Sequence, residues 1–357
     1  MRHFLPKFLR RWTRSQPAPA AAAPAPKPAI AGQPVVSLEA AHQAFGRLKT
    51  KSELAAAARD RVGPQLEAEF RRYVGWLGGL GYSFASCEEA PLRFDAPRVH
   101  LRYDVHVRDL FGVFLLANLH DELQIPGSFQ ICWEHSRAEM EASPLFLKLR
   151  VFDRRYVQFG FHCAPESGWL IEERFAGRSE GLDGFVASGA ARVLIEEWFG
   201  AFECHGHDAP VLIRARDAAD AHLARTAASF ARHFGPAATI SGHGTPLAAA
   251  YLAATRDEPR LAQLAGYLHA VEYLTPERIG RHNFASELTR FDEKKSPGAF
   301  VMFENPIDDM EERYRRRVAG GAGFVVLFHP ATWTSNHLRP FIDRVTASGW
   351  LERGGQG

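Results

Sequence analysis

Asp104 and His106 stand two residues apart, where the apolar run that begins at Leu101 ends. Side chains at positions i and i+2 of a β-strand point to the same face, so we expect these two to share one pocket. An imidazole nitrogen binds a borderline metal ion, and a carboxylate beside the metal can take a proton from an attacking water. The pair therefore indicates metal-assisted hydrolysis. The alternative for Asp104 is a buried ion pair with Arg102 or another arginine, which we favour less because position i+2 carries a histidine.

Short apolar runs alternate with segments of helical periodicity after Pro97. The runs cover residues 99–105, 127–133, 156–161, 237–241, 269–274, 299–303 and 324–328. This alternation predicts parallel strands joined by helical crossovers, and so many in succession favour a closed or nearly closed barrel. An open doubly wound sheet is the alternative. Two further helices are expected before the barrel, over residues 37–61 and 64–80.

An imidazole or a carboxylate follows almost every run, and the carboxyl ends of barrel strands converge on one face. We choose His106, His162 and His243 as metal ligands, because three such ligands with an open fourth position form the usual hydrolytic zinc arrangement. His329 follows the last strand, next to the first strand in a closed barrel, and suits a general acid. The candidates for substrate contact are Glu134, Glu304, Asn305, Asn283 and Trp333.

The segment Glu203-Cys204-His205-Gly206-His207-Asp208 is dense in potential ligands but has no place in the strand and helix alternation. A solvated loop is the favoured interpretation, with ligands or a loop beside the cleft as alternatives. The other cysteines are scattered without a C-x-x-C pair, which indicates neither a cysteine-rich zinc site nor a disulfide framework.

Composition predicts a cytoplasmic protein with a substantial core and gives no reason to expect nucleic acid as a partner. The 357 residues carry 46% hydrophobic side chains, and the net charge is only +2. No secretory signal or membrane-spanning stretch is visible in the sequence. The oligomeric state stays open.

Residues 1–34 differ from the rest of the chain. Residues 1–14 interleave arginine and lysine with Phe, Leu and Trp, a basic amphipathic pattern that could contact an anionic membrane at the inner face. A solvated tail is the favoured alternative. Residues 17–34 are almost wholly Ala and Pro and predict an extended tether. We therefore divide the chain into a tail (1–34), a helical extension (35–96) and a barrel (97–350).

Four motifs occur in one order along the chain: Arg102-Tyr103-Asp104-Val105-His106, Gly160-Phe161-His162, Ser241-Gly242-His243-Gly244 and Leu327-Phe328-His329-Pro330-Ala331-Thr332-Trp333. Over roughly Tyr73 to Trp350, their order and spacing resemble the divergent polysaccharide deacetylases, metal-dependent carbohydrate esterases with the NodB-homology fold. The resemblance implies a distorted (β/α)7 barrel. It also implies Asp104 as base, His162 and His243 as metal ligands and His329 as acid.

Two positions depart from the family pattern. His106 stands where the family has a second acid, and a neutral ligand there favours zinc over harder ions. Glu166 stands where the family often has a second histidine after His162, so His243 must supply that ligand. The expectation is a zinc-dependent amidase that removes an acetyl group from an amino sugar or glycan precursor. The alternatives are a non-catalytic glycan- or partner-binding barrel and a metal-dependent hydrolase of another amide.

Overall fold

The computed structural model describes a large part of the chain after residue 36. The described residues are 37–89, 92–134, 137–163, 200–201, 203–206, 209–242, 280–282, 284, 286–287, 299–302, 307–330, 343–344 and 347. All of them belong to the compact unit Val35–Gly357. The expected strand at 269–274 and the N-terminal segment 1–34 lie outside the described residues.

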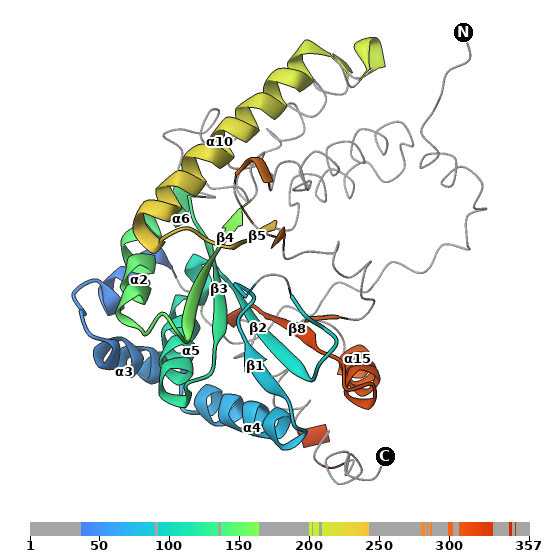
Figure 1. The fold of residues 1–357 in the computed structure, drawn as a ribbon. Coiled ribbons are helices and arrows are strands. Elements are labelled where there is room, and N and C mark those ends of the chain that lie inside the picture. Colours follow the sequence, from blue (N-terminus) through green and yellow to red (C-terminus); the bar gives the residue numbers. More distant parts are fainter. Residues whose placement is uncertain are drawn as a thin grey trace, which may run out of the picture. The chain divides into compact units, whose positions relative to one another are not determined.

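The described strands form one parallel, curled sheet, a half-barrel (Figure 1). The strands are β1 (Ser83–Ala85), β2 (Arg98–Val105), β3 (Gly127–Cys132), β4 (Val157–Cys163), β5 (Thr239–Gly242), β6 (Ser286–Glu287), β7 (Phe300–Met302) and β8 (Phe324–Phe328). Their order is β6-β5-β4-β3-β2-β8-β7, with β1 also paired to β2. The predicted parallel α/β architecture is confirmed, including the pairing of β2 with β8. Closure into a deacetylase-type barrel stays a prediction.

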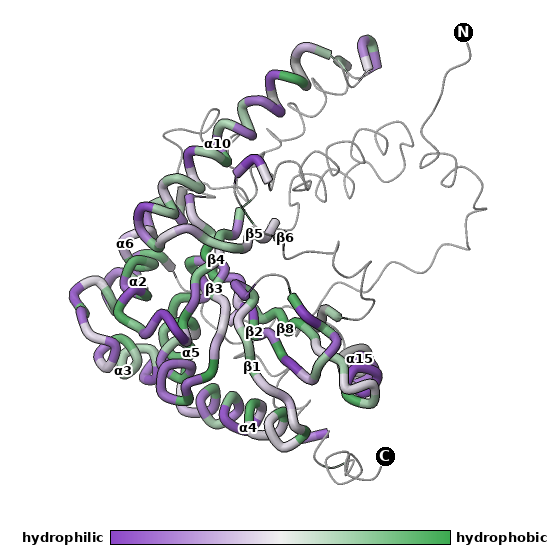
Figure 2. The backbone as a smooth tube through the Cα atoms, in the orientation of Figure 1, coloured by the Kyte–Doolittle hydropathy of each residue, from purple (hydrophilic) through white to green (hydrophobic). Residues whose placement is uncertain are grey.

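Helices pack around this sheet, the first three of them ahead of its first strand in the chain and the others between its strands. They are α2 (Leu38–Phe45), α3 (Lys51–Val62), α4 (Gln65–Gly79), α5 (Leu110–Leu123), α6 (Arg137–Phe146), α10 (Pro210–Phe234) and α15 (Ile307–Ala319), with 3₁₀ turns η1 (Val107–Asp109) and η2 (Leu147–Val151). The helix expected over 37–61 is two helices, because Thr50 starts α3 with a capping box that includes Glu53. In Figure 2, α15 is mostly hydrophilic, as expected for a helix with one face in water.

One face of the sheet is apolar and carries the main core. Tyr103 stacks between Phe129 on β3 and Phe328 on β8, with ring centroids 4.8 and 5.4 Å away. The first turns of α5 are buried as well, and residues 110–117 of this helix are all apolar or glycine. Tyr103 also hydrogen-bonds to His120 of α5, with 2.8 Å between Oη and Nε2. Burial of large side chains on this face supplies the main driving force for folding.

The other face of the same strands is polar, although it is also buried. Arg102 and Asp104 on β2, Ser128 and Gln130 on β3, and Ser241 on β5 are each at most 4% exposed. Side chains alternate between the two faces of a strand, so each polar residue follows an apolar one. Among the described helices, none is long and apolar enough to cross a membrane.

Candidate metal centre

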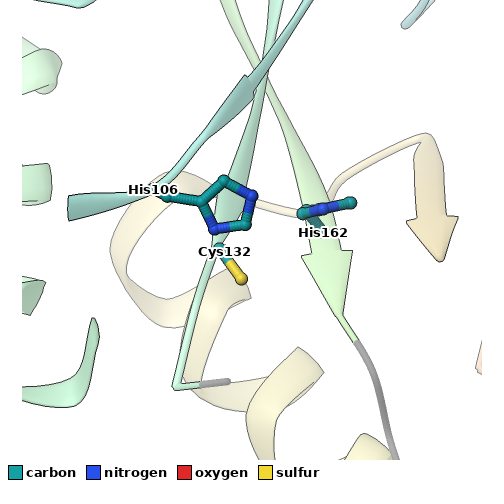
Figure 3. A group of neighbouring side chains, drawn as sticks. All are labelled: His106, Cys132 and His162. Carbon is teal, nitrogen blue, oxygen red and sulfur yellow. The ribbon is translucent and has the colours of Figure 1, made fainter. Parts of the chain in front are cut away.

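Three donor side chains lie in one row across the carboxyl ends of β2, β3 and β4. Cys132 pairs with His162 in the register of β3 and β4, and Val105 pairs with Ile131 in that of β2 and β3. His106, the next residue after Val105, is therefore level with Cys132. Figure 3 shows the His106 ring directed toward His162, with the Cys132 thiol on the strand between them. The sheet register thus gathers residues that are far apart in sequence.

The geometry of this group suits a metal ion. One donor atom from each of the three residues lies within 4.8 Å of the other two, and all three side chains are buried. Around a tetrahedral zinc ion, nitrogen and sulfur donors lie about 3.3 to 3.6 Å apart, so small side-chain movements suffice. Two imidazoles and a thiolate are ligands of a borderline or soft cation. His106, Cys132 and His162 could therefore hold a metal ion.

His106 is held in place by two carboxylates. Its Nδ1 lies 2.7 Å from Glu139 Oε1 on α6, and its backbone N–H donates to Asp109 Oδ2 over 2.9 Å. Burial alone would lower the pKa of His106, but the hydrogen bond and charge of Glu139 outweigh it and raise this pKa. An imidazole that donates from Nδ1 carries its lone pair on Nε2, so Glu139 orients His106 as a ligand.

Cys132 is completely buried, and burial together with Glu139 raises the pKa of its thiol well above the ordinary value. A metal ion must therefore displace the thiol proton on binding.

His162 is supported from the opposite side. Its Nδ1 lies 2.8 Å from Ser241 Oγ on β5. Ser241 Oγ donates its only proton to Gln130 Oε1 over 3.1 Å, so it accepts the hydrogen bond from the His162 Nδ1–H. This tautomer also carries the lone pair on Nε2. Both histidines are thus prepared in the manner typical of metal ligands, with the second ring nitrogen bound to a supporting group.

Asp104 forms a buried ion pair with Arg102, so the expectation that favoured a site without this ion pair is corrected. Arg102 Nε and Nη2 donate to Asp104 Oδ1 and Oδ2 over 2.8 and 2.9 Å, and both side chains are buried. The reason is the same alternation that pairs Asp104 with His106, because Arg102 is the i−2 neighbour on that face. Asp104 still lies at the site: Oδ2 is 3.8 Å from His162 Nε2 and 3.9 Å from His329 Nε2.

His329 joins the group from β8. Its ring is nearly parallel to that of His106, with centroids 6.0 Å apart. Glu134, a candidate for substrate contact, has a left-handed backbone with φ of 52° and accepts a hydrogen bond from Ser229 of α10 over 3.0 Å. The remaining predicted site residues lie outside the described residues: His243, Glu304, Asn305, Asn283 and Trp333.

Sequence reasoning missed Cys132. A lone cysteine carries no spacing signal, and Cys132 lies inside the expected strand over 127–133, whereas His106 and His162 each follow the end of an expected strand. Only the observed register of β3 and β4 places Cys132 level with His162. In the ligand-rich segment after Glu203, Cys204 and His205 are exposed, which fits a solvated position, whereas His207 and Asp208 lie outside the described residues.

Comparison with known proteins adds no relative: no protein-family model, curated protein or solved structure matches the chain. The case for function therefore depends on the residues of this site and on the motifs of the sequence.

Proposed function

We propose that the chain is a zinc-dependent hydrolase that removes an N-acyl group, acetyl in the first instance, from an amino sugar or glycan precursor. The observation that carries the proposal is the row of His106, Cys132 and His162, each histidine oriented by a hydrogen bond at Nδ1. The donor set supports zinc chemistry. The substrate class is supported only by the resemblance of the four motifs to polysaccharide deacetylases.

A zinc ion bound here would supply Lewis acidity, which polarises a carbonyl group and makes water a stronger nucleophile. The role of the chain is to hold the reacting groups and move protons. We propose that Asp104 accepts the proton of the attacking water at Oδ2, the oxygen nearest His162 and His329. His329 then protonates the departing amine from Nε2. Arg102 fixes the Asp104 carboxylate in position through both of its oxygens.

Cys132 and His243 compete for the place of the third ligand. A catalytic zinc site keeps one position open beside three protein ligands, so four protein ligands would favour a structural site. We propose Cys132 as the third ligand, since it lies in the same row as the two histidines. His243 stays a prediction from the sequence.

The test is the zinc content of the purified full-length protein. We expect equimolar zinc in the wild type, and loss of most of it in His162→Ala and in Cys132→Ser. Cys87→Ser is the matched control, because Cys87 is also completely buried but lies outside the group. If zinc is retained in Cys132→Ser but lost in His243→Ala, the third ligand is His243 and not Cys132. A wild type without stoichiometric metal would remove the mechanism.

The pairing of Asp104 with Arg102 favours a second candidate, a barrel that holds metal and glycan without catalysis. Both carboxylate oxygens accept from Arg102, which draws electron density from the proposed base. Acetate release from N-acetylated amino-sugar precursors separates the two. The hydrolase predicts a fall of about 10²-fold or more in Asp104→Asn, in line with general base catalysis. Zinc binding without acetate release in the wild type would favour the second candidate.

A further inference from the structure

A chain of hydrogen bonds, buried near His162 and partly buried at its far end, leads from the metal site to a carboxylate on the segment after β1. Ser241 Oγ donates to Gln130 Oε1 over 3.1 Å, and Gln130 Nε2 donates to Glu88 Oε1 over 2.9 Å. Thr239 completes the far end, where its backbone N–H donates to Glu88 Oε2 over 2.9 Å and its hydroxyl donates to Oε1. Gln130, Thr239 and Ser241 are completely buried. The polar face therefore links His162 to Glu88 without a break.

Each hydrogen bond in this chain has a fixed direction. The Glu88 carboxylate accepts from Thr239 and from the Gln130 amide, so Gln130 must direct its NH₂ toward Glu88 and its carbonyl toward Ser241. Ser241 then has an acceptor for its proton and receives the Nδ1–H of His162. Reversal of the Gln130 amide would place its oxygen against the carboxylate, which would leave buried groups unsatisfied.

The backbone makes room for this connection at Gly160. Gln130 is on β3 and pairs with Gly160 of β4, whereas its partners Thr239 and Ser241 are on β5. A Cβ at position 160 would lie 1.9 Å from Gln130 Nε2. Only the absence of a side chain on β4 lets the Gln130 side chain cross that strand. The register places Gly160 beside Gln130, and the missing side chain leaves the space through which Gln130 reaches β5.

We infer that Glu88, Gln130 and Ser241 are positioning residues that set the tautomer of His162 and present its Nε2 to the metal. The three residues act through one another, and of these three it is Ser241 that hydrogen-bonds to His162. The importance of this function for catalysis rests on the proposed metal site, but the tautomer itself is a property of the metal-free chain. Supporting groups of this kind typically change metal affinity by about 10–100-fold when they are removed.

The experiment is ¹⁵N NMR of the histidine side chains in the metal-free, full-length protein, in which Nδ1–H and Nε2–H tautomers give distinct patterns. The His162 signal is identified by its loss in His162→Gln. In the wild type we expect the Nδ1–H tautomer of His162. In Ser241→Ala we expect a shift of the population toward the Nε2–H tautomer, and a zinc Kd weaker by about 10–100-fold.

Two further variants make the outcome specific. Ser128→Ala is the matched control: Ser128 is equally buried on the same face, but its hydroxyl hydrogen-bonds to the Ser86 hydroxyl and the Cys87 backbone N–H, and not to the side chains of Glu88, Gln130 or Ser241. We expect it to keep the wild-type tautomer and zinc Kd. The double variant Glu88→Gln with Gln130→Glu exchanges the two side chains. The carboxylate at position 130 can still accept from Ser241 Oγ, and the amide NH₂ at position 88 can donate to that carboxylate. We expect this double variant to keep the Nδ1–H tautomer as well.

The inference is overturned if His162 in Ser241→Ala remains wholly in the Nδ1–H form, or if the double variant shifts the tautomer as Ser241→Ala does. A tautomer shift in Ser241→Ala, together with a wild type that binds no zinc, would support the positioning role while removing the proposed function. Zinc binding in the wild type, together with an unchanged His162 tautomer in Ser241→Ala, would support the proposed metal site while removing the positioning role. The two proposals therefore fail separately.

Discussion

The two faces of the central strands hold opposite kinds of side chain at similar burial. On one face of β2, Tyr103 stacks against Phe129 and Phe328. On the other, the equally enclosed Arg102 and Asp104 pair with each other. Aromatic burial stabilises the fold, whereas a buried ion pair loses in desolvation much of what it gains in attraction. The apolar face therefore stabilises the fold, whereas the polar face carries the candidate metal site.

The largest expected effect is on the apolar face. Phe129→Ala removes a fully buried ring whose centroid is 4.8 Å from that of Tyr103. Loss of contacts and the remaining cavity should lower the free energy of unfolding by about 3–5 kcal/mol, measured by urea denaturation. Zinc content of the folded fraction should not change. Lost zinc with unchanged stability would contradict the division between the faces.

Gly160→Ala tests the polar face with a single methyl group. Because the new Cβ would lie 1.9 Å from Gln130 Nε2, the glutamine must leave its position. We expect a loss of about 1–3 kcal/mol in the free energy of unfolding and, unlike Phe129→Ala, a weaker zinc Kd.

Gly75→Ala is the control for Gly160→Ala. Gly75 lies in α4 with nothing within 4 Å of an added Cβ, so alanine there should stabilise the protein by about 0.5–1 kcal/mol. An unchanged zinc Kd in Gly160→Ala would show that the crossing of Gln130 does not matter to the site.

His120 is a titratable group on the apolar face, and its effect should appear in acid. Its Nδ1 donates to the Ile125 carbonyl and its Nε2 accepts from Tyr103, so the neutral ring is satisfied, and burial lowers its pKa from 6.5 to about 4. The unfolded chain then binds more protons, and the contribution to stability, full above pH 6.5, is lost as the pH falls toward 4. At pH 5 the loss is about 2 kcal/mol.

The measurement for His120 compares urea midpoints at pH 7.5 and pH 5 in the wild type and in His120→Gln. The variant has no imidazole to protonate, so its midpoint should fall less between the two pH values. An identical fall in both proteins would show that His120 does not contribute to acid sensitivity.

The smallest effect is expected away from both faces. Thr50 accepts a hydrogen bond from the Glu53 backbone N–H, and Glu53 accepts one from that of Thr50. Thr50→Ala should lower the free energy of unfolding by about 1 kcal/mol. Urea denaturation measures this loss, and zinc titration should give the wild-type Kd. A weaker Kd here would mean that any loss of stability disturbs the site.

Much of the fold follows from patterns visible in the sequence. Apolar runs alternating with helical segments predicted the parallel sheet, and β2 does pair with β8 as the interpretation of His329 required. The break between α2 and α3 was missed, because the cap at Thr50 lies within a continuous helical pattern. The capping box at Thr50 starts a new helix there, although the helical periodicity of the sequence continues through it.

The sequence predicted only those site residues that directly follow or end a strand and are of a type, histidine or carboxylate, with recognisable chemistry. Asp104, His106, His162 and His329 come together as expected. Cys132 and the partners of His162 could not be found in this way, because they depend on which strands are neighbours and on their register. Such long-range pairing is a property of the folded sheet and leaves no spacing signal in the chain.

The pairing of β2 with β8 also has a consequence for the order of assembly. His106, Cys132 and His162 are all synthesised long before β8, whereas β2 must wait for residues 324–328 to complete its second edge. Pairing over so long a separation is intrinsically slow, so we expect β8 to gain amide protection last during refolding, a sequence that pulse-labelling hydrogen exchange would detect. A nascent chain could thus acquire its metal donors early and the proposed acid, His329, only after β8 has been synthesised. The proposed hydrolytic activity would then stay silent until β8 has paired with β2.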